Sequence, residues 1–114
     1  MMMEDFRTNS NAVIDEIARS REFAVLHMKI GSDYESLDEI DKYRAEFMAL
    51  RGLLGQMHTV LARQAGFIHD VEWNEFLSRM RFTSKRKNFQ IVWERIKKHY
   101  PPSVHQVWEQ CTKG

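Results

Sequence analysis

Six residues between positions 79 and 87 have side chains suited to holding an anion, and five of them are basic. They are Arg79, Arg81, Ser84, Lys85, Arg86 and Lys87. A helix that begins at Thr83 or Ser84 would place three consecutive cations in its first turn. Helix N-termini normally attract Asp or Glu, and their free N–H groups bind phosphate. The pattern therefore predicts an anion or nucleic-acid contact here, with Phe82 as the ring best placed for stacking a base.

The same charges allow a second interpretation, in which the helix begins later, near Asn88, and the lysines belong to a solvated turn. Residues 1–78 carry 8 Lys and Arg against 14 Asp and Glu, whereas residues 79–99 carry 8 Lys and Arg against one Glu. Such asymmetry is typical either of an anionic partner or of a basic end that docks on the acidic part of its own chain. Both interpretations stay open.

The chain lacks the common catalytic and metal-binding motifs. Its five histidines, His27, His58, His69, His99 and His105, have no HxxxH or HExxH spacing, and Cys111 is its single cysteine. No D-x-D-x-D-G loop, phosphate-binding glycine loop, G-x-S-x-G or CxxC is present. We therefore expect no metal, no cofactor, no internal disulfide and no enzymatic activity.

Length and composition predict one globular domain. The chain has 114 residues, of which 43% are hydrophobic and 29% charged, which is enough for a modest core. We expect a flexible N-terminus over residues 1–9 and a single α-helical domain over residues 10–112. No apolar run approaches the roughly 18 residues of a membrane helix, and the start of the chain does not resemble a signal peptide. These features predict a cytoplasmic protein.

Apolar residues recur at intervals of three and four, which predicts an all-α fold. We expect a small bundle of about five helices with one long central helix. The long helix should run from a capping box of Ser36 and Glu39 to a glycine cap at Gly66. Along it lies a seven-residue apolar repeat, typical of a helix packed lengthwise on another helix. Its members are Ile40, Tyr43, Phe47, Leu50, Leu54, Met57 and Leu61.

The back of the long helix carries a stripe of small residues, Ala45, Ala49, Gly52 and Thr59, with Gly55 beside it. Glycine inside a helix costs about 1 kcal/mol relative to alanine. The stripe indicates either a tolerated weak spot or bend, the interpretation we favour, or a second helix that lies close against this side.

The rest of the chain predicts three further helices, the first of them capped by Asp70. Apolar periodicity predicts a core that draws on the long helix and on these later helices. We expect buried side chains at Phe47, Leu50, Leu54, Trp73, Phe89, Trp93 and Ile96.

Seven spaced residues between the long helix and the C-terminus form a pattern: Gly66, Ile68, Trp73, Trp93, Tyr100, Val104 and Val107. Over residues 36–110 this order resembles a helical region of uncharacterised bacterial proteins that often carry an N-terminal membrane helix. The resemblance implies an all-α fold and no particular activity. The chain departs from the group in three ways: it has no membrane helix, it has Gln56 or His58 where an acid is common, and its basic segment is heavier.

Two functions follow as hypotheses. The first is a non-enzymatic interaction or regulatory module that binds another protein or forms a homodimer, with either Ile40, Phe47 and Leu54 or the small-residue stripe at the contact. The second is a regulator that binds nucleic acid or another polyanion through residues 79–99. No helix-turn-helix signature accompanies that basic segment.

Overall fold

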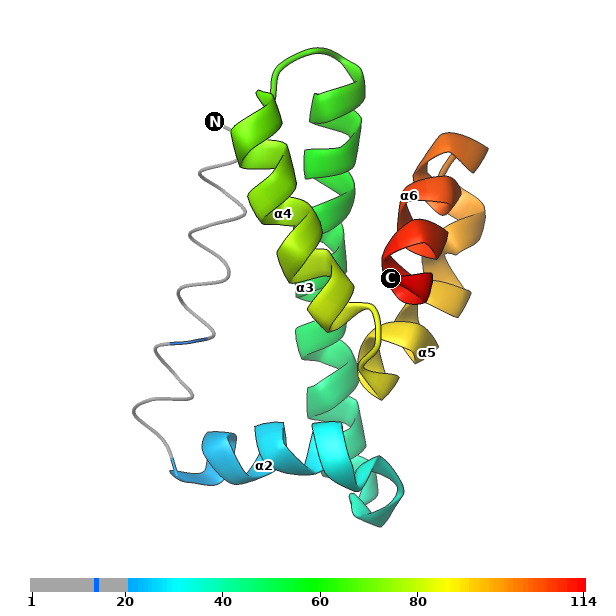
Figure 1. Ribbon diagram of the computed structural model, residues 1–114. Helices are drawn as coiled ribbons and strands as arrows, with labels where there is room; N and C mark the ends of the chain where they lie inside the picture. Colours follow the sequence, from blue (N-terminus) through cyan, green and yellow to red (C-terminus); the bar gives the residue numbers. More distant parts are fainter. Residues whose placement is uncertain (1–13, 15–20) are drawn as a thin grey trace.

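The computed structural model describes residue 14 and residues 21–114, and residues 1–13 and 15–20 lie outside the described part (Figure 1). The flexible N-terminus expected over residues 1–9 therefore falls outside the described residues. Residues 21–114 form five α-helices and two short 3-10 helices, without a strand. The elements are α2 (Arg21–Ser32), η1 (Tyr34–Ser36), α3 (Glu39–Gln64), α4 (Asp70–Thr83), α5 (Lys87–Ile96), η2 (Lys97–His99) and α6 (Pro102–Lys113). The all-α prediction is confirmed.

The long helix α3 is the centre of the bundle (Figure 1). After it, α4 runs back toward the N-terminal end of α3, α2 crosses that end, and α5 and α6 lie together on another side. The Gln56 amide on α3 donates a 2.8 Å hydrogen bond to the Thr83 hydroxyl at the end of α4. None of the helices in the described ranges combines the length and apolar character needed to cross a lipid bilayer.

The start of α3 differs from the sequence prediction. Ser36 belongs to η1, and its hydroxyl donates a 2.8 Å hydrogen bond to the Asp33 carbonyl. The N-cap of α3 is Asp38, whose carboxylate accepts a 2.8 Å hydrogen bond from the Asp41 N–H. The predicted capping box of Ser36 with Glu39 is therefore wrong, because a closer carboxylate satisfies the free N–H group.

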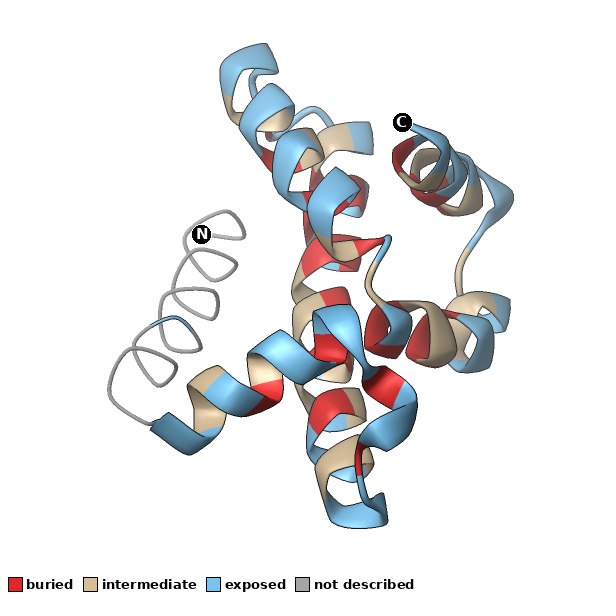
Figure 2. Cartoon of the chain, turned by 60° about the horizontal axis from the view of Figure 1, so that its bottom comes forward, coloured by how far each residue is buried: buried red, intermediate tan, exposed pale blue. Residues whose placement is uncertain are grey.

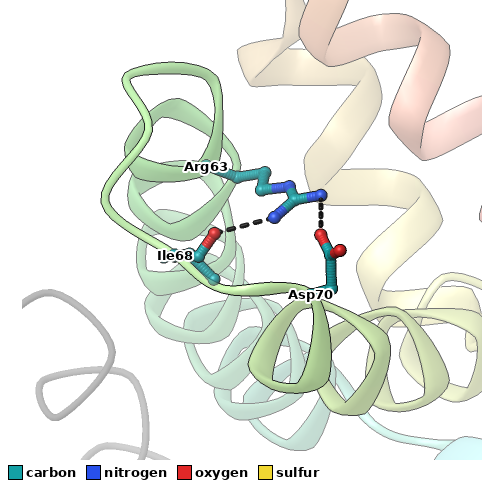
Figure 3. A network of polar contacts seen from close by, with 3 residues as sticks. All are labelled: Arg63, Ile68 and Asp70. Atoms are coloured by element: carbon teal, nitrogen blue, oxygen red, sulfur yellow. Dashed lines mark hydrogen bonds and ion pairs between the residues drawn. The ribbon is translucent and has the colours of Figure 1, made fainter.

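The turn from α3 to α4 is organised by Gly66 and by Arg63, whose contacts with Ile68 and Asp70 are drawn in Figure 3. Gly66 has a φ of 86°, a conformation that glycine adopts without strain, and the predicted glycine cap is confirmed. Arg63 donates hydrogen bonds to the Ile68 carbonyl at 2.7 Å and to the Asp70 carboxylate at 2.6 Å. Asp70 is the first residue of α4 and His69 occupies the cap position. The prediction that Asp70 caps this helix is wrong, because its carboxylate pairs with Arg63 instead.

Buried residues, red in Figure 2, belong to two clusters of packed side chains. The larger cluster joins α3 to α4, α5 and α6: Ala49, Leu53, Met57, Val60, Phe76, Met80, Phe89, Val92, Trp93, Val104, Trp108 and Cys111. The smaller one joins α2 and its following turn to α3: Leu26, Ile30, Tyr34, Leu37 and Ala45. In the larger cluster the Trp93 ring stacks on the Trp108 ring, with centroids 4.9 Å apart.

The small-residue stripe of α3 faces α5. A Cβ atom added to Gly52 would lie 2.9 Å from Cζ of Phe89, so only a hydrogen fits there. About two turns earlier on α3, the Ala45 carbonyl accepts a 2.9 Å hydrogen bond from the Asn88 amide. The interpretation of a closely packed second helix is confirmed, and the weak-spot interpretation that we favoured from the sequence is wrong.

Because α5 packs on the small stripe, the opposite side of α3 is not part of the core that the described residues form. The predicted core is right for Phe89 and Trp93, which are buried. The side chains of Leu50, Trp73 and Ile96 are partly buried against the larger cluster. The prediction is wrong for Phe47 and Leu54, which are 52% and 44% exposed.

Candidate interaction surfaces

The exposed apolar face of α3 is the first candidate surface. Five members of the seven-residue repeat lie on it, and we call them the α3 seam: Ile40, Tyr43, Phe47, Leu54 and Leu61, exposed by 67%, 69%, 52%, 44% and 38%. Four of these residues follow one another at intervals of seven. The three residues named from the sequence as the self-association contact, Ile40, Phe47 and Leu54, all belong to the seam and are accessible.

The seam turns toward the core along the helix. A strict seven-residue repeat drifts by about 20° per heptad on a straight helix. The other repeat position accordingly runs from exposed Tyr43 through half-buried Leu50 to Met57, which has no exposed surface. Leu50 and Met57 thus belong to the larger cluster, whereas the positions at intervals of seven from Ile40 to Leu61 stay exposed. A partner that follows the whole repeat would have to wind around α3 with a left-handed twist.

Charged residues flank the seam with opposite signs on its two sides. In heptad terms, with Ile40 at the first core position, Glu39 stands on one flank and Arg44 and Arg51 stand on the other. Glu39, Arg44 and Arg51 are exposed. Arg44 also lies 3.7 Å from the Asp41 carboxylate, one turn earlier on the same helix. Flanking positions of this kind set the orientation of paired helices.

The basic segment does not begin a helix where the sequence suggested. Helix α4 continues to Thr83, and Ser84 is its C-cap. Ser84 is fully buried, and its hydroxyl lies 3.4 Å from the Arg81 carbonyl. Helix α5 begins at Lys87. The predicted helix start at Thr83 or Ser84, with Ser84 as an anion contact, is wrong, because Thr83 is the last residue of α4 and Ser84 is its C-cap. The later start, near Asn88, is confirmed.

Arg86 explains part of the unusual charge in this turn. Its guanidinium donates a 2.9 Å hydrogen bond to the His27 carbonyl on α2 and lies 3.4 Å from Nδ1 of the same residue. It also stands over the Phe82 ring, 5.7 Å from the centroid. Cations are favourable beside the last turn of a helix, where carbonyl groups lack partners, and Arg86 lies there: a Cβ atom added to Gly31 would be 3.3 Å from its guanidinium. Arg86 therefore serves the end of α2 rather than the start of its own helix.

Burial favours the neutral form of the His27 imidazole that lies beside Arg86. It lowers the pKa of the His27 imidazole, and the nearby Arg86 charge lowers it further. Burial also lowers the pKa of Arg86. A neutral His27 can present the lone pair of Nδ1 to the guanidinium, which has only donors, whereas a protonated ring would repel it. The contact thus depends on His27 staying neutral.

The remaining cations surround a cleft of about 820 Å³, the second candidate surface. The cleft lies where the end of α2 meets the end of α4 and the start of α5. Arg81, Lys85 and Lys87 line it and are exposed, and Phe82 lies among them with 63% of its surface exposed. Arg79, the remaining basic residue named from the sequence, lies on α4 outside the lining. Sequence reasoning missed the cleft, since the α2 end that closes it is over 45 residues away.

Other reactive groups are isolated or inert. Cys111 is buried, and burial raises the pKa of its thiol, which keeps it protonated and unreactive. Within the residues that the structure describes, no group of three or more His, Cys, Asp or Glu side chains could hold a metal ion. Comparison with protein-family models, curated proteins and solved structures found no match for this chain. Function therefore has to be inferred from the two surfaces themselves.

Proposed function

We propose that this protein is a non-enzymatic helical interaction module, and that its α3 seam pairs with the α3 seam of a second copy. The observation that carries the proposal is the run of exposed apolar side chains at intervals of seven residues. In that run, Ile40, Phe47 and Leu54 expose between 67% and 44% of their surfaces. Single exposed apolar residues are common on monomers, whereas aligned ones mark interaction sites.

A second copy of the chain fits the seam for two reasons. A seven-residue repeat is complementary to the same repeat, because knobs at its core positions insert into holes of identical spacing. The flanking charges are also self-complementary when the two helices run parallel. In that arrangement Glu39 of one copy faces Arg44 of the other, five residues further along. A two-fold axis beside α3 makes this contact twice.

The decisive measurement is the molar mass in solution, obtained by light scattering over a range of protein concentrations. We expect the wild-type chain to approach the mass of a dimer as concentration rises. The double variant Phe47→Glu/Leu54→Glu should remain monomeric, because it buries four carboxylates in the paired seam. Its circular dichroism should keep the helical signal, since both residues are exposed in the monomer.

A matched control uses two exposed apolar residues outside the repeat. Phe67 and Val71 are 79% and 74% exposed, after α3 and at the start of α4. The variant Phe67→Glu/Val71→Glu should dimerise like the wild type. A wild-type mass that stays monomeric at every concentration would overturn the proposal, and so would equal loss of dimer in both double variants.

A further inference from the structure

The basic cleft is separate from the α3 seam and has the character of a ligand site. Its volume of about 820 Å³ falls in the range of pockets that hold small molecules and cofactors. Its walls come from separate parts of the chain: the end of α2 with η1, the end of α4, the link into α5 with the start of that helix, and Gly114 after α6. The site is thus made by tertiary packing, not by a single helix terminus.

Charge in the cleft is unbalanced. Arg81, Lys85 and Lys87 line it, and within the described residues no carboxylate forms an ion pair with any of them. The acidic side chain in the lining is Glu35, which instead lies 3.5 Å from the ammonium group of Lys42 outside the cleft. Three converging cations that have no ion-pair partner among the described residues favour an anionic ligand.

The cleft also offers an aromatic surface. Phe82 lies in the lining and keeps 63% of its surface exposed. Arg86 is fixed by its 2.9 Å hydrogen bond to the His27 carbonyl, and its guanidinium stands 5.7 Å from the Phe82 centroid. The ring is thus supported by a rigid neighbour and is available to a planar group. Exposed rings beside cations are the combination that binds bases and phosphates together.

We propose that the cleft binds a nucleotide, with its phosphates against Lys85, Lys87 and Arg81 and its base against Phe82. The chemistry is shared by a free nucleoside triphosphate and by one nucleotide of a single strand. An inorganic polyphosphate would use the cations alone, and an acidic peptide would leave the ring without a stacking partner. Arg86 is a positioning residue, since its contacts hold Phe82 and the end of α2.

Fluorescence anisotropy with labelled ATP and with a labelled oligo(dT) strand tests the site, with unlabelled tripolyphosphate as a competitor. We expect at least one of the two probes to bind at low salt and to weaken as salt rises. Tighter binding of ATP would identify a free nucleotide as the ligand, and tighter binding of oligo(dT) would identify a strand. Tripolyphosphate should compete weakly, because it has no base.

Two variants with one control separate the contributions. Lys85→Gln/Lys87→Gln should weaken binding by about tenfold or more, as expected when charged hydrogen bonds are lost. Phe82→Ala should weaken it roughly five- to 150-fold, the effect of losing one stacked base, while leaving tripolyphosphate affinity unchanged. Lys97→Gln/Lys98→Gln removes the same charge outside the cleft and should change affinity by no more than about twofold.

The proposal is overturned if neither probe binds at low salt, or if the two double variants lose affinity equally. It is also overturned if Phe82→Ala binds ATP and oligo(dT) as well as the wild type, which would leave an electrostatic surface without a base site. All variants are first compared by thermal melting, and each keeps Arg86. The molar mass of Lys85→Gln/Lys87→Gln in solution should match that of the wild type. A failure of the nucleotide proposal is thereby distinguished from a failure of the proposed pairing through the α3 seam.

Discussion

Trp93 concentrates more aromatic contacts than any neighbouring side chain of the larger cluster. Its ring stacks on Trp108 at 4.9 Å and on Tyr100 at 6.4 Å, and the His105 ring meets it edge-on at 5.4 Å. These contacts tie α5 to η2 and α6, which have few other buried side chains of this size. Trp93 therefore makes a large contribution to the stability of the C-terminal third of the chain, beside the other buried residues there.

Replacing Trp93 with alanine should lower the free energy of unfolding by about 3–5 kcal/mol, the cost of removing a large buried ring. Chemical denaturation followed by circular dichroism measures this change. Phe67→Ala is the control, because Phe67 is 79% exposed and its loss should cost no more than about 0.5 kcal/mol. Equal costs for the two variants would contradict the assigned core.

Gly52 is a second residue at which packing, rather than helix propensity, decides how a substitution changes stability. Gly52→Ala gains about 1 kcal/mol of helix propensity, yet its Cβ would lie 2.9 Å from Cζ of Phe89. We expect net destabilisation of about 1–3 kcal/mol, the usual cost of overpacking. In the Phe89→Leu background the same change should become neutral or stabilising, and denaturation of all four proteins measures the coupling. Additive effects would show that α5 does not press on Gly52.

Between elements, the contact of α2 with the α4–α5 link depends on pH. The folded-state pKa of His27 lies below its unfolded value of about 6.5, so folding favours the neutral ring. The stabilisation that the neutral His27 gives to the folded state is complete above about pH 6.5. It is lost as pH falls through the pKa of His27 in the folded state. The melting temperature of the wild type should therefore drop more between pH 8 and pH 5 than that of His27→Gln, which keeps an uncharged partner for Arg86. Parallel pH profiles would contradict this assignment.

The orientation of the proposed dimer is a second property of elements. If the α3 helices pair in parallel, Glu39→Lys should weaken dimerisation roughly two- to fivefold for each of the two symmetry-related contacts. Arg44→Glu should weaken it similarly, and the combined Glu39→Lys/Arg44→Glu variant should recover most of the affinity. Sedimentation equilibrium measures the three dissociation constants. Tighter dimers in either single variant would indicate antiparallel pairing instead.

For the whole molecule, pairing through the seam couples stability to concentration. A protein that dimerises only when folded becomes more stable as its concentration rises. The wild-type melting temperature should rise over a hundredfold concentration range, while that of Phe47→Glu/Leu54→Glu stays level. Scanning calorimetry provides the comparison. A wild-type melting temperature independent of concentration would show that the seam is unpaired in the native state.

The all-α class, the long helix and its glycine end were predictable because they depend on local sequence. Periodicity of three and four reflects helix geometry itself, and the positive φ at Gly66 is a local requirement. The starts of α3 and α4 were less predictable. Asp38 caps α3 although Ser36 lies two residues before it, and the Asp70 carboxylate pairs with Arg63 although it stands at the start of α4. Capping is a competition between nearby donors and acceptors, and the spacing alone does not identify the winner.

The residues of the seam were identifiable from their spacing, but the side of α3 that forms the core was not. Helix α3 has two faces that could be buried, the apolar repeat and the small-residue stripe. Burying either face removes apolar surface from water. The tertiary structure decided between them, because Phe89 fits against Gly52 at a distance that the larger seam residues would not allow. In the same way, the sequence showed the run of Lys85, Arg86 and Lys87 but not what each residue contacts. In the tertiary structure, Arg86 donates a hydrogen bond to α2, whereas the two lysines line an open cleft.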